Sequence, residues 1–335
     1  MVPKICIYRF DRSFIVFFSF LLLGCGGGDS SSQTSTYEAW DLGETTIVQQ
    51  GLPGNDVTSM ACDSTNLFFS IDGGALMQVA HTDTIVGEAL PQEPYMRNRY
   101  EMKLDDQRAI YWSNGLSGAG NPGEIIKTAL DTQQQLWSIG DLNGPERLQM
   151  VNGQIYFIDD LQEVMRISLS GLDRETIYSS ESRNLCALAV SPEGDLFLGS
   201  YSNENDTPQS VISRIPVGGG PPIEISRPNS HRIVQILIQG NFLFVVDTHL
   251  IYSLDTLDGT IVELVNGDPL DPYAPFFVDE DGIYWVGSDN QTYAAYLDGS
   301  NLITVGEGTF FCKCGSLMYW YNRAGVLMRR TLAHH

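Results

Sequence analysis

Short apolar and aromatic runs alternate with polar turns along most of the chain, and one five-residue run recurs through it. Each copy has Phe or Tyr at its second position and ends on Asp, Asn, Ser or Gly. The seven copies occupy residues 68–72, 110–114, 155–159, 196–200, 243–247, 283–287 and 318–322. Runs of this length and composition, bounded by turn residues, predict β-strands.

The copies are regularly spaced, and each lies within a unit of common layout. Their last residues are 42, 45, 41, 47, 40 and 35 positions apart. Residues 275–305 show the layout well: an inner strand, a tight turn, the aromatic strand, a second turn, and two outer strands. Asp-Gly and Asn-Gly pairs supply the positive φ angles that hairpin turns demand. No stretch has convincing helical periodicity. Four strands per unit at this spacing predict an all-β fold, a seven-bladed β-propeller.

The two ends of the repeated region are both incomplete. After residues 326–332 only three residues remain, too few for the fourth strand of the seventh unit. Residues 44–50 precede the first unit and belong to none. Because β proteins avoid exposed sheet edges, we expect residues 44–50 to supply the outer strand of the seventh blade and to close the ring.

The first residues have the layout of an export signal. Basic residues within positions 4–12 precede an apolar run at 14–23, which is much shorter than the ~20 residues of a membrane-spanning helix. The run ends in Leu-Leu-Gly-Cys, which resembles the bacterial lipobox. The resemblance implies cleavage before Cys25 and lipidation of that residue. An ordinary signal peptide followed by an accidental cysteine is the alternative.

These features divide the chain into a signal peptide at 1–24, a lipidated polar tether at 25–43 and a propeller at 44–335. The Gly-, Ser- and Thr-rich composition of residues 26–36 is typical of a flexible linker. By resemblance to sorted bacterial lipoproteins, the lack of Asp directly after Cys25 favours the outer membrane. We therefore expect a protein of the bacterial cell envelope, held to the membrane by lipid.

Composition supports a folded, exported protein. The chain of 335 residues is 43% hydrophobic and 18% charged, which is typical of a globular protein rather than a disordered one. Its 19 basic and 41 acidic residues give a formal charge of −22. Nucleic acid is excluded as a partner on this ground, because phosphate binding needs a basic surface.

Four cysteines follow Cys25, and two of them are placed for a disulfide bond where the ring closes. Cys62 and Cys312 each lie six residues before an aromatic strand, at matching depths on inner strands that the ring makes neighbours. We predict a Cys62–Cys312 disulfide, with the other pairings open, and a buried free thiol at Cys186. The Cys312–Cys314 pair could be half of a metal site, but it lacks a second pair and has no histidine at ligand spacing. No metal site is predicted.

Two units written out in full resemble the YWTD repeats of the low-density-lipoprotein-receptor class, whose strand Ile-Tyr-Trp-Thr-Asp is followed by Leu-Asp-Gly-Ser-Asn. Residues 110–114 read Ile-Tyr-Trp-Ser-Asn, residues 283–285 read Ile-Tyr-Trp, and residues 297–301 read Leu-Asp-Gly-Ser-Asn. The likeness covers residues 55–332 and extends to bacterial lipoprotein propellers of unknown function. Because the receptor propellers have six blades, six is the alternative to seven.

The resemblance also assigns a role to the residue that ends each aromatic strand. In YWTD repeats this residue hydrogen-bonds to backbone within and between blades. A structural role, rather than metal binding, is therefore implied for the Asp and Asn residues at this position. They are Asp72, Asn114, Asp159, Asp247 and Asn322.

Function is less constrained than fold. The Gly-rich loop at 115–120 contains a serine but is not the G-x-S-x-G motif, and no phosphate-binding, dinucleotide or zinc-protease motif is present. No cofactor is predicted, although the acidic loops at 202–209 and 266–273 could hold Ca²⁺. The leading hypothesis is a non-enzymatic binding or assembly module for an envelope protein or an extracellular ligand. A channel-centred enzyme, such as a metal-dependent lactonase or lyase, is the alternative, with catalytic residues that cannot be named.

Overall fold

The computed structural model describes residues 40–50, 52, 57–71, 76–90, 99–114, 123–204, 207–227, 231–266 and 274–333. These residues form strands and turns and no helix. A helix long and apolar enough to cross a membrane is therefore absent from the part of the chain described. All the described residues belong to one compact unit, residues 38–335.

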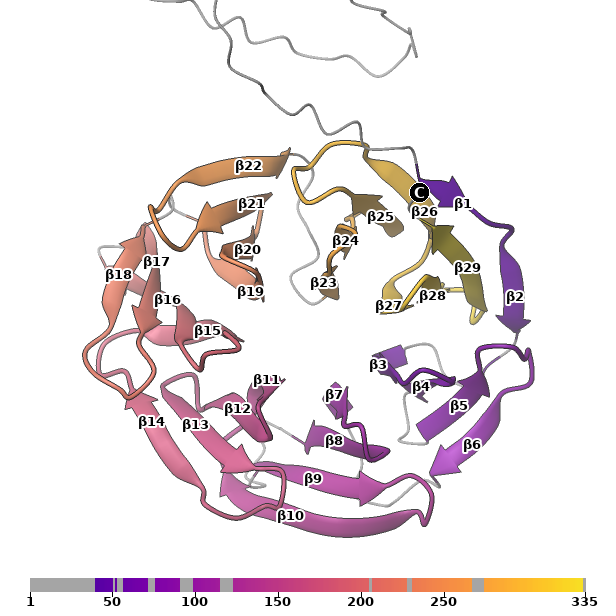
Figure 1. Cartoon of the computed structure of the whole chain (residues 1–335), viewed down its shortest axis with the longest axis horizontal. Helices are drawn as coiled ribbons and strands as arrows, with labels where there is room; N and C mark the ends of the chain where they lie inside the picture. The colour runs from indigo at the N-terminus through magenta and orange to yellow at the C-terminus, as the bar shows by residue number, and fades with distance from the viewer. Residues whose placement is uncertain are drawn as a thin grey trace, which may run out of the picture. The chain divides into compact units, whose positions relative to one another are not determined.

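Seven antiparallel sheets stand in a ring around a central channel, which confirms the seven-bladed β-propeller and rules out six blades (Figure 1). Each sheet places one inner strand at the channel and its later strands progressively outward. Blades 1 and 2 are formed by β3 (Val57–Cys62), β4 (Asn66–Ile71), β5 (Leu76–Ala80), β6 (Gly87–Leu90), β7 (Arg99–Leu104), β8 (Ala109–Asn114), β9 (Gly123–Ala129) and β10 (Gln134–Leu142). Blades 3 and 4 are formed by β11 (Glu146–Val151), β12 (Gln154–Asp159), β13 (Glu163–Ser168), β14 (Glu175–Ser179), β15 (Asn184–Val190), β16 (Leu196–Glu204), β17 (Thr207–Ile215) and β18 (Ile223–Ser226).

The remaining blades repeat this order up to the seam, where the N-terminal strands join the last sheet. Blades 5 and 6 are formed by β19 (Ile233–Gln239), β20 (Phe242–Asp247), β21 (Leu250–Asp255), β22 (Ile261–Asn266), β23 (Phe276–Val278), β24 (Ile283–Val286), β25 (Gln291–Ala295) and β26 (Ile303–Glu307). Blade 7 is formed by β27 (Phe310–Cys314), β28 (Leu317–Tyr321), β29 (Leu327–Ala333), β1 (Asp41–Leu42) and β2 (Thr46–Gln49).

The predicted closure by the N-terminal segment is confirmed. β2 pairs antiparallel with β29, with Thr46 opposite Arg329 and Ile47 opposite Met328. Figure 1 shows the indigo strands β1 and β2 lying along β29. β1 lies before residue 44 and extends the same edge, because its two residues also pair with β29. The first two strands of the described chain and its last strand therefore share one sheet.

Aromatic residues of the second strand in each blade fill the spaces between blades. Because strand side chains alternate between the two faces, Phe68 packs against Trp112 of blade 2. Its neighbour Phe69 packs against Tyr319 and Tyr321 of blade 7. All five side chains are essentially inaccessible to solvent. Burying one such side chain contributes about 1.5–3 kcal/mol, so the recurring run stabilises the contacts between blades.

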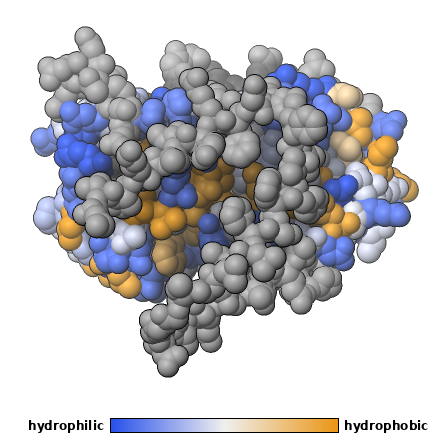
Figure 2. Space-filling view, turned by 90° about the horizontal axis from the view of Figure 1, so that it is seen from above, coloured by the Kyte–Doolittle hydropathy of each residue, from blue (hydrophilic) through white to orange (hydrophobic). Residues whose placement is uncertain are grey.

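The outer strands are the most exposed parts of the blades. Figure 2 looks onto the edge of the ring that lies at the top of Figure 1, and hydrophobic residues lie among hydrophilic ones on that edge. β22, which runs along it, carries Ile261 and Val262 with 47% and 49% of their surface exposed. The outer strands thus leave large apolar side chains exposed, whereas the aromatic strands bury theirs between blades.

Candidate functional site

The seven inner strands enclose a channel of about 1690 Å³. Side chains of β3, β7, β11, β15, β19, β23 and β27 all contribute to its wall.

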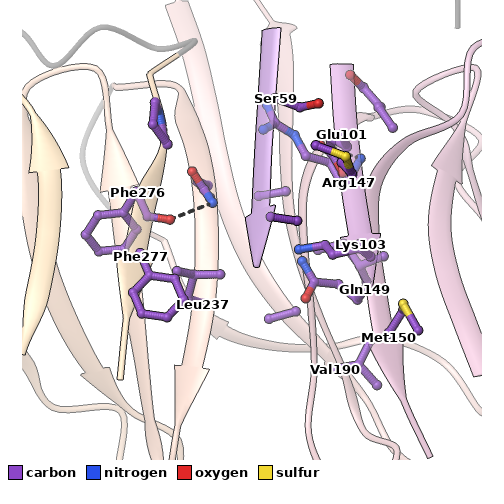
Figure 3. A pocket seen from close by; sticks show the side chains of 18 of the residues that line it. Ser59, Glu101, Lys103, Arg147, Gln149, Met150, Val190, Leu237, Phe276 and Phe277 are labelled. Atoms are coloured by element: carbon purple, nitrogen blue, oxygen red, sulfur yellow. Dashed lines mark hydrogen bonds between the residues drawn. The ribbon is translucent and has the colours of Figure 1, made fainter. Parts of the chain in front are cut away.

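The channel wall has two chemically different sides (Figure 3). The neighbouring strands β7 and β11 supply charged residues together with Met102 and Met150, whereas β19 and β23 supply mainly apolar residues together with the amide Gln235. The polar side carries Glu101, Lys103, Glu146, Arg147 and Gln149. The apolar side carries Leu237 and Phe277, and Figure 3 shows them together with Phe276 across the channel from Glu101 and Lys103. An amphipathic molecule could satisfy both sides at once.

Glu101 is held in place by backbone groups. Its carboxylate accepts the N–H of Arg147 at 2.9 Å and the N–H of Leu148. These donors are free because the pairing of β11 with β12 is irregular between Glu146 and Gln149, where Arg147 has a φ of 61°. Glu101 on blade 2 thus completes the hydrogen bonding of a bulge on blade 3.

Glu146, beside this bulge, has a perturbed carboxyl group. Burial raises its pKa, and the negative charge of Glu101 adds to the rise, while Arg147 and Arg232 oppose it.

Lys313 on β27 is paired with two carboxylates of blade 6. Only 2% of its side chain is exposed, and its ammonium group forms ion pairs with Asp279 and with Asp281, the latter at 3.0 Å. It also lies 5.1 Å from the ring centre of Tyr284. Burial and the negative charge of Asp279 raise the pKa of Tyr284 well above its usual range. This ion pair joins blade 7 to blade 6.

The cysteines correct the predicted pairing. Cys62 is bonded to Cys314, with 6.0 Å between their Cα atoms, and the predicted partner Cys312 is a free thiol. The reason is turn length. Cys62 pairs with Leu67 across a four-residue turn, whereas Cys314 pairs with Leu317 across a two-residue turn. Cys312 was predicted because it lies as many residues before its aromatic strand as Cys62 does. The shorter turn of blade 7 puts the position that matches Cys62 two residues later, at Cys314.

The two free thiols differ in exposure: Cys186 is buried, whereas Cys312 is partly exposed. Cys186 is 2% exposed, and burial raises the pKa of its thiol to about 12. Burial likewise raises the pKa of the Cys312 thiol to about 12. Both thiols are therefore protonated at neutral pH.

The residues at the ends of the aromatic strands mostly bond to backbone. Asp159 Oδ1 accepts the N–H of Asn143 at 2.8 Å, which joins blade 3 to the end of blade 2. Asp247 Oδ1 accepts the N–H groups of His249 and Leu250, each at 2.7 Å. Asn322 Oδ1 likewise accepts the N–H groups of Ala324 and Val326, whereas Asn114 Nδ2 donates to the side chain of Glu124 at 3.4 Å. Asp72 lies outside the described residues.

Several predicted features fall on residues that are not described. Cys25, residues 26–39 of the predicted tether and the loop at 267–273 are among them, whereas residues 41–42, predicted as tether, form β1 of blade 7. The connection at 202–209 is shorter than its sequence suggests, because β16 and β17 pair as far as Glu204 and Thr207. The Ca²⁺ sites and the lipid anchor therefore remain predictions.

Among the described residues, the group with three or more potential metal ligands within 4.8 Å of one another consists of Cys62, Cys312 and Cys314. The described carboxylates and histidines form no such group. Sequence spacing identified the Cys312–Cys314 pair but missed Cys62 as its third member. Cys312 and Cys314 are two residues apart on a strand, so their sulfurs share one face. That shared face was the signal that could have pointed to Cys62 on the neighbouring blade.

No family model matches the chain, and no curated protein matches it. Solved structures do. The extracellular domain of the putative hybrid two-component system BT4673 from B. thetaiotaomicron has a TM-score of 0.63 at 10% identity, over 85% of this chain and 39% of that one. YCF48 bound to D1 peptide has a TM-score of 0.61 at 13% identity, over 88% and 96% of the two chains. A nidogen/laminin complex has a TM-score of 0.53 at 16% identity, over 71% and 92%. These likenesses show the fold alone. The YWTD resemblance stays a prediction, since no family model supports it.

Proposed function

We propose that the protein is a lipid-anchored propeller of the bacterial cell envelope, and that it binds a segment of a partner in its channel without catalysing a reaction. The two-sided channel wall is the observation that carries this proposal. Its volume of about 1690 Å³ exceeds the ~300–1,000 Å³ of ordinary small-molecule pockets. A polypeptide segment with one polar and one apolar side is the partner class that suits it.

The side chains of the channel are arranged for recognition rather than for bond breaking. Phe277 keeps 37% of its surface exposed at the apolar side, and opposite it Lys103, Arg147 and Glu146 offer charge of both signs. Exposed aromatic and charged groups around one cavity are typical of binding sites. Glu101 is already engaged by backbone N–H groups, which leaves it less free to bind a metal or move a proton.

The similar structures support this choice without deciding it. One of them is a propeller with a bound peptide, YCF48, and another is an extracellular domain of a bacterial protein. A partner-binding role and an envelope location for the present chain are consistent with both. No observation on the described residues favours the lactonase or lyase alternative.

Site-specific cross-linking in the native host tests the channel. A photoreactive phenylalanine analogue replaces Phe277 in the channel or, as a control, Leu136, which is 52% exposed on the outer strand β10. We expect a discrete adduct with one envelope protein from position 277 and none from position 136. Absence of an adduct at position 277, or the same adducts from both positions, would refute binding in the channel.

Metabolic labelling tests the anchor separately. Cells supplied with an alkynyl fatty acid should label the wild-type protein, and Cys25→Ala should abolish the label and release the protein from membranes. Labelled or membrane-bound Cys25→Ala protein would refute lipidation at this residue while leaving the channel proposal intact.

A further inference from the structure

Three sulfur atoms meet where blade 7 closes against blade 1. Cys312 Sγ lies 3.8 Å from Cys62 Sγ and 3.8 Å from Cys314 Sγ, and the latter two are joined as a disulfide. We propose that, once this disulfide is reduced, the three cysteines bind one soft d¹⁰ metal ion, Cu⁺ or Zn²⁺, at the wall of the channel. The site is separate from the proposed partner-binding function.

The backbone places the three side chains together. Cys312 and Cys314 are two residues apart on β27 and therefore share one face of the strand, and Cys62 faces them from β3. All three pack against the same hydrophobic cluster between blades 7 and 1. Lys313, between the two cysteines of β27, points to the opposite face, where Asp279 and Asp281 hold it. The ion pair on one face thus fixes the orientation of the sulfurs on the other.

The sulfur separations suit a metal ion. Zinc–sulfur bonds are about 2.3 Å long, and three sulfurs at that distance from one ion lie roughly 3.8–4.0 Å apart in tetrahedral or trigonal geometry. The two distances from Cys312 already fall at this value. Only Cys62 and Cys314 must separate, and they do so when their bond is broken.

The chemistry of each step balances. A phosphine reductant breaks the Cys62–Cys314 bond and becomes its oxide, while water supplies the oxygen atom and the two protons of the new thiols. The three thiols then lose three protons as three sulfur–metal bonds form, and the metal keeps its oxidation state. Thiolates select Cu⁺ and Zn²⁺ over hard cations such as Mg²⁺ and Ca²⁺.

The surroundings leave one coordination position open. Cys62 and Cys312 line the channel, and the described His, Cys, Asp and Glu residues supply no fourth member of the group. Three ligands are enough for trigonal Cu⁺, whereas Zn²⁺ would complete its tetrahedron with water. Met60 lies two residues before Cys62 on β3 and packs against the same cluster, so a soft thioether is also on this face.

The disulfide and the proposed metal would both link the first and the last blade. The disulfide joins residues 252 positions apart, and a metal held by β3 and β27 would join the same two strands. The ring is therefore cross-linked at its seam in both the oxidised and the reduced protein, with a metal replacing the covalent bond.

Anaerobic metal binding to the full-length protein tests the proposal. Protein reduced with the phosphine and freed of it by gel filtration is mixed with Cu⁺, or in a second arm with Zn²⁺, and bound metal is measured by mass spectrometry after a further gel filtration. We expect one ion per chain in the reduced protein and none in the oxidised protein. X-ray absorption should show three sulfur neighbours.

Single cysteine variants identify the ligands. Cys312→Ser is the most informative, because it leaves the disulfide partners in place, and it should abolish stoichiometric binding; Cys62→Ser and Cys314→Ser should do the same. The control Cys186→Ser removes a buried thiol outside the cluster and should bind metal like the wild type. Circular dichroism checks that each variant is folded. Failure of both ions to bind the reduced protein, or full binding by folded Cys312→Ser, would overturn the proposal.

Discussion

Glu101 on blade 2 accepts the backbone N–H of Arg147 on blade 3 at 2.9 Å, and this contact links two inner strands that share no ladder hydrogen bonds. The same carboxylate accepts the N–H of Leu148. One side chain therefore satisfies two donors that the bulge in β11 leaves without strand partners.

Removing this carboxylate should destabilise the ring. Glu101→Ala leaves two partly buried N–H groups without an acceptor, and each hydrogen bond to a charged group contributes about 1.5–3 kcal/mol. We expect a loss of about 2–4 kcal/mol in the free energy of unfolding, measured by urea denaturation, and a smaller loss for Glu101→Gln, which keeps one acceptor oxygen. The exposed Glu193 at the channel mouth is the control: Glu193→Ala should change stability by less than ~0.5 kcal/mol. Equal effects at the two positions would contradict the role of Glu101.

The sequence predicted the fold but not this contact at the bulge. The number of blades and the closing strand followed from the recurring aromatic run and the short seventh unit, because both are properties of hydrophobic pattern and length. Glu101 gave no such signal, since its partners are backbone groups of another blade. The partner of Cys62 was predicted wrongly because two turns differ in length, and strand spacing alone does not reveal turn length. The two-sided channel required knowing which alternate residues of seven separate strands face inward.

The buried ion pair of Lys313 predicts an order among variants. Asp279→Asn together with Asp281→Asn keeps the shape of the turn but leaves a buried ammonium group unpaired, which costs about 3–5 kcal/mol. Lys313→Met removes the charge itself and keeps a long apolar side chain, so it should cost markedly less. Thermal or urea unfolding measures both. The exposed pair of Arg227 and Glu224 is the control, and Glu224→Gln should cost less than ~1 kcal/mol. A Lys313→Met variant that is less stable than the double variant would contradict this account.

The buried thiol of Cys186 predicts a pH dependence of stability. Burial raises its pKa to about 12 in the folded protein, whereas an unfolded cysteine titrates near pH 8.5. Above that pH the unfolded chain binds fewer protons than the folded one, so stability is fully present below about pH 8.5 and falls by about 1.4 kcal/mol per pH unit above it. Cys312 adds a similar slope for the same reason. Cys186→Ala should therefore remove about half of the decline between pH 9 and 10, measured by urea denaturation. An unchanged slope in the variant would show that Cys186 does not contribute.

The closing strand β2 predicts very unequal losses of stability at two adjacent positions. Val48 is 3% exposed and packs with Leu52 and Tyr321 at the seam, whereas Ile47 is 50% exposed on the other face of the strand. Val48→Asp buries an unpaired charge between blades 7 and 1 and should cost more than ~4 kcal/mol. Ile47→Asp places the same carboxylate in solvent and should cost less than ~1 kcal/mol. Because loss of β2 exposes the edge of β29, Val48→Asp should also self-associate, which analytical ultracentrifugation would detect. If both variants remained stable monomers, the ring would have to be closed by contacts other than those of β2.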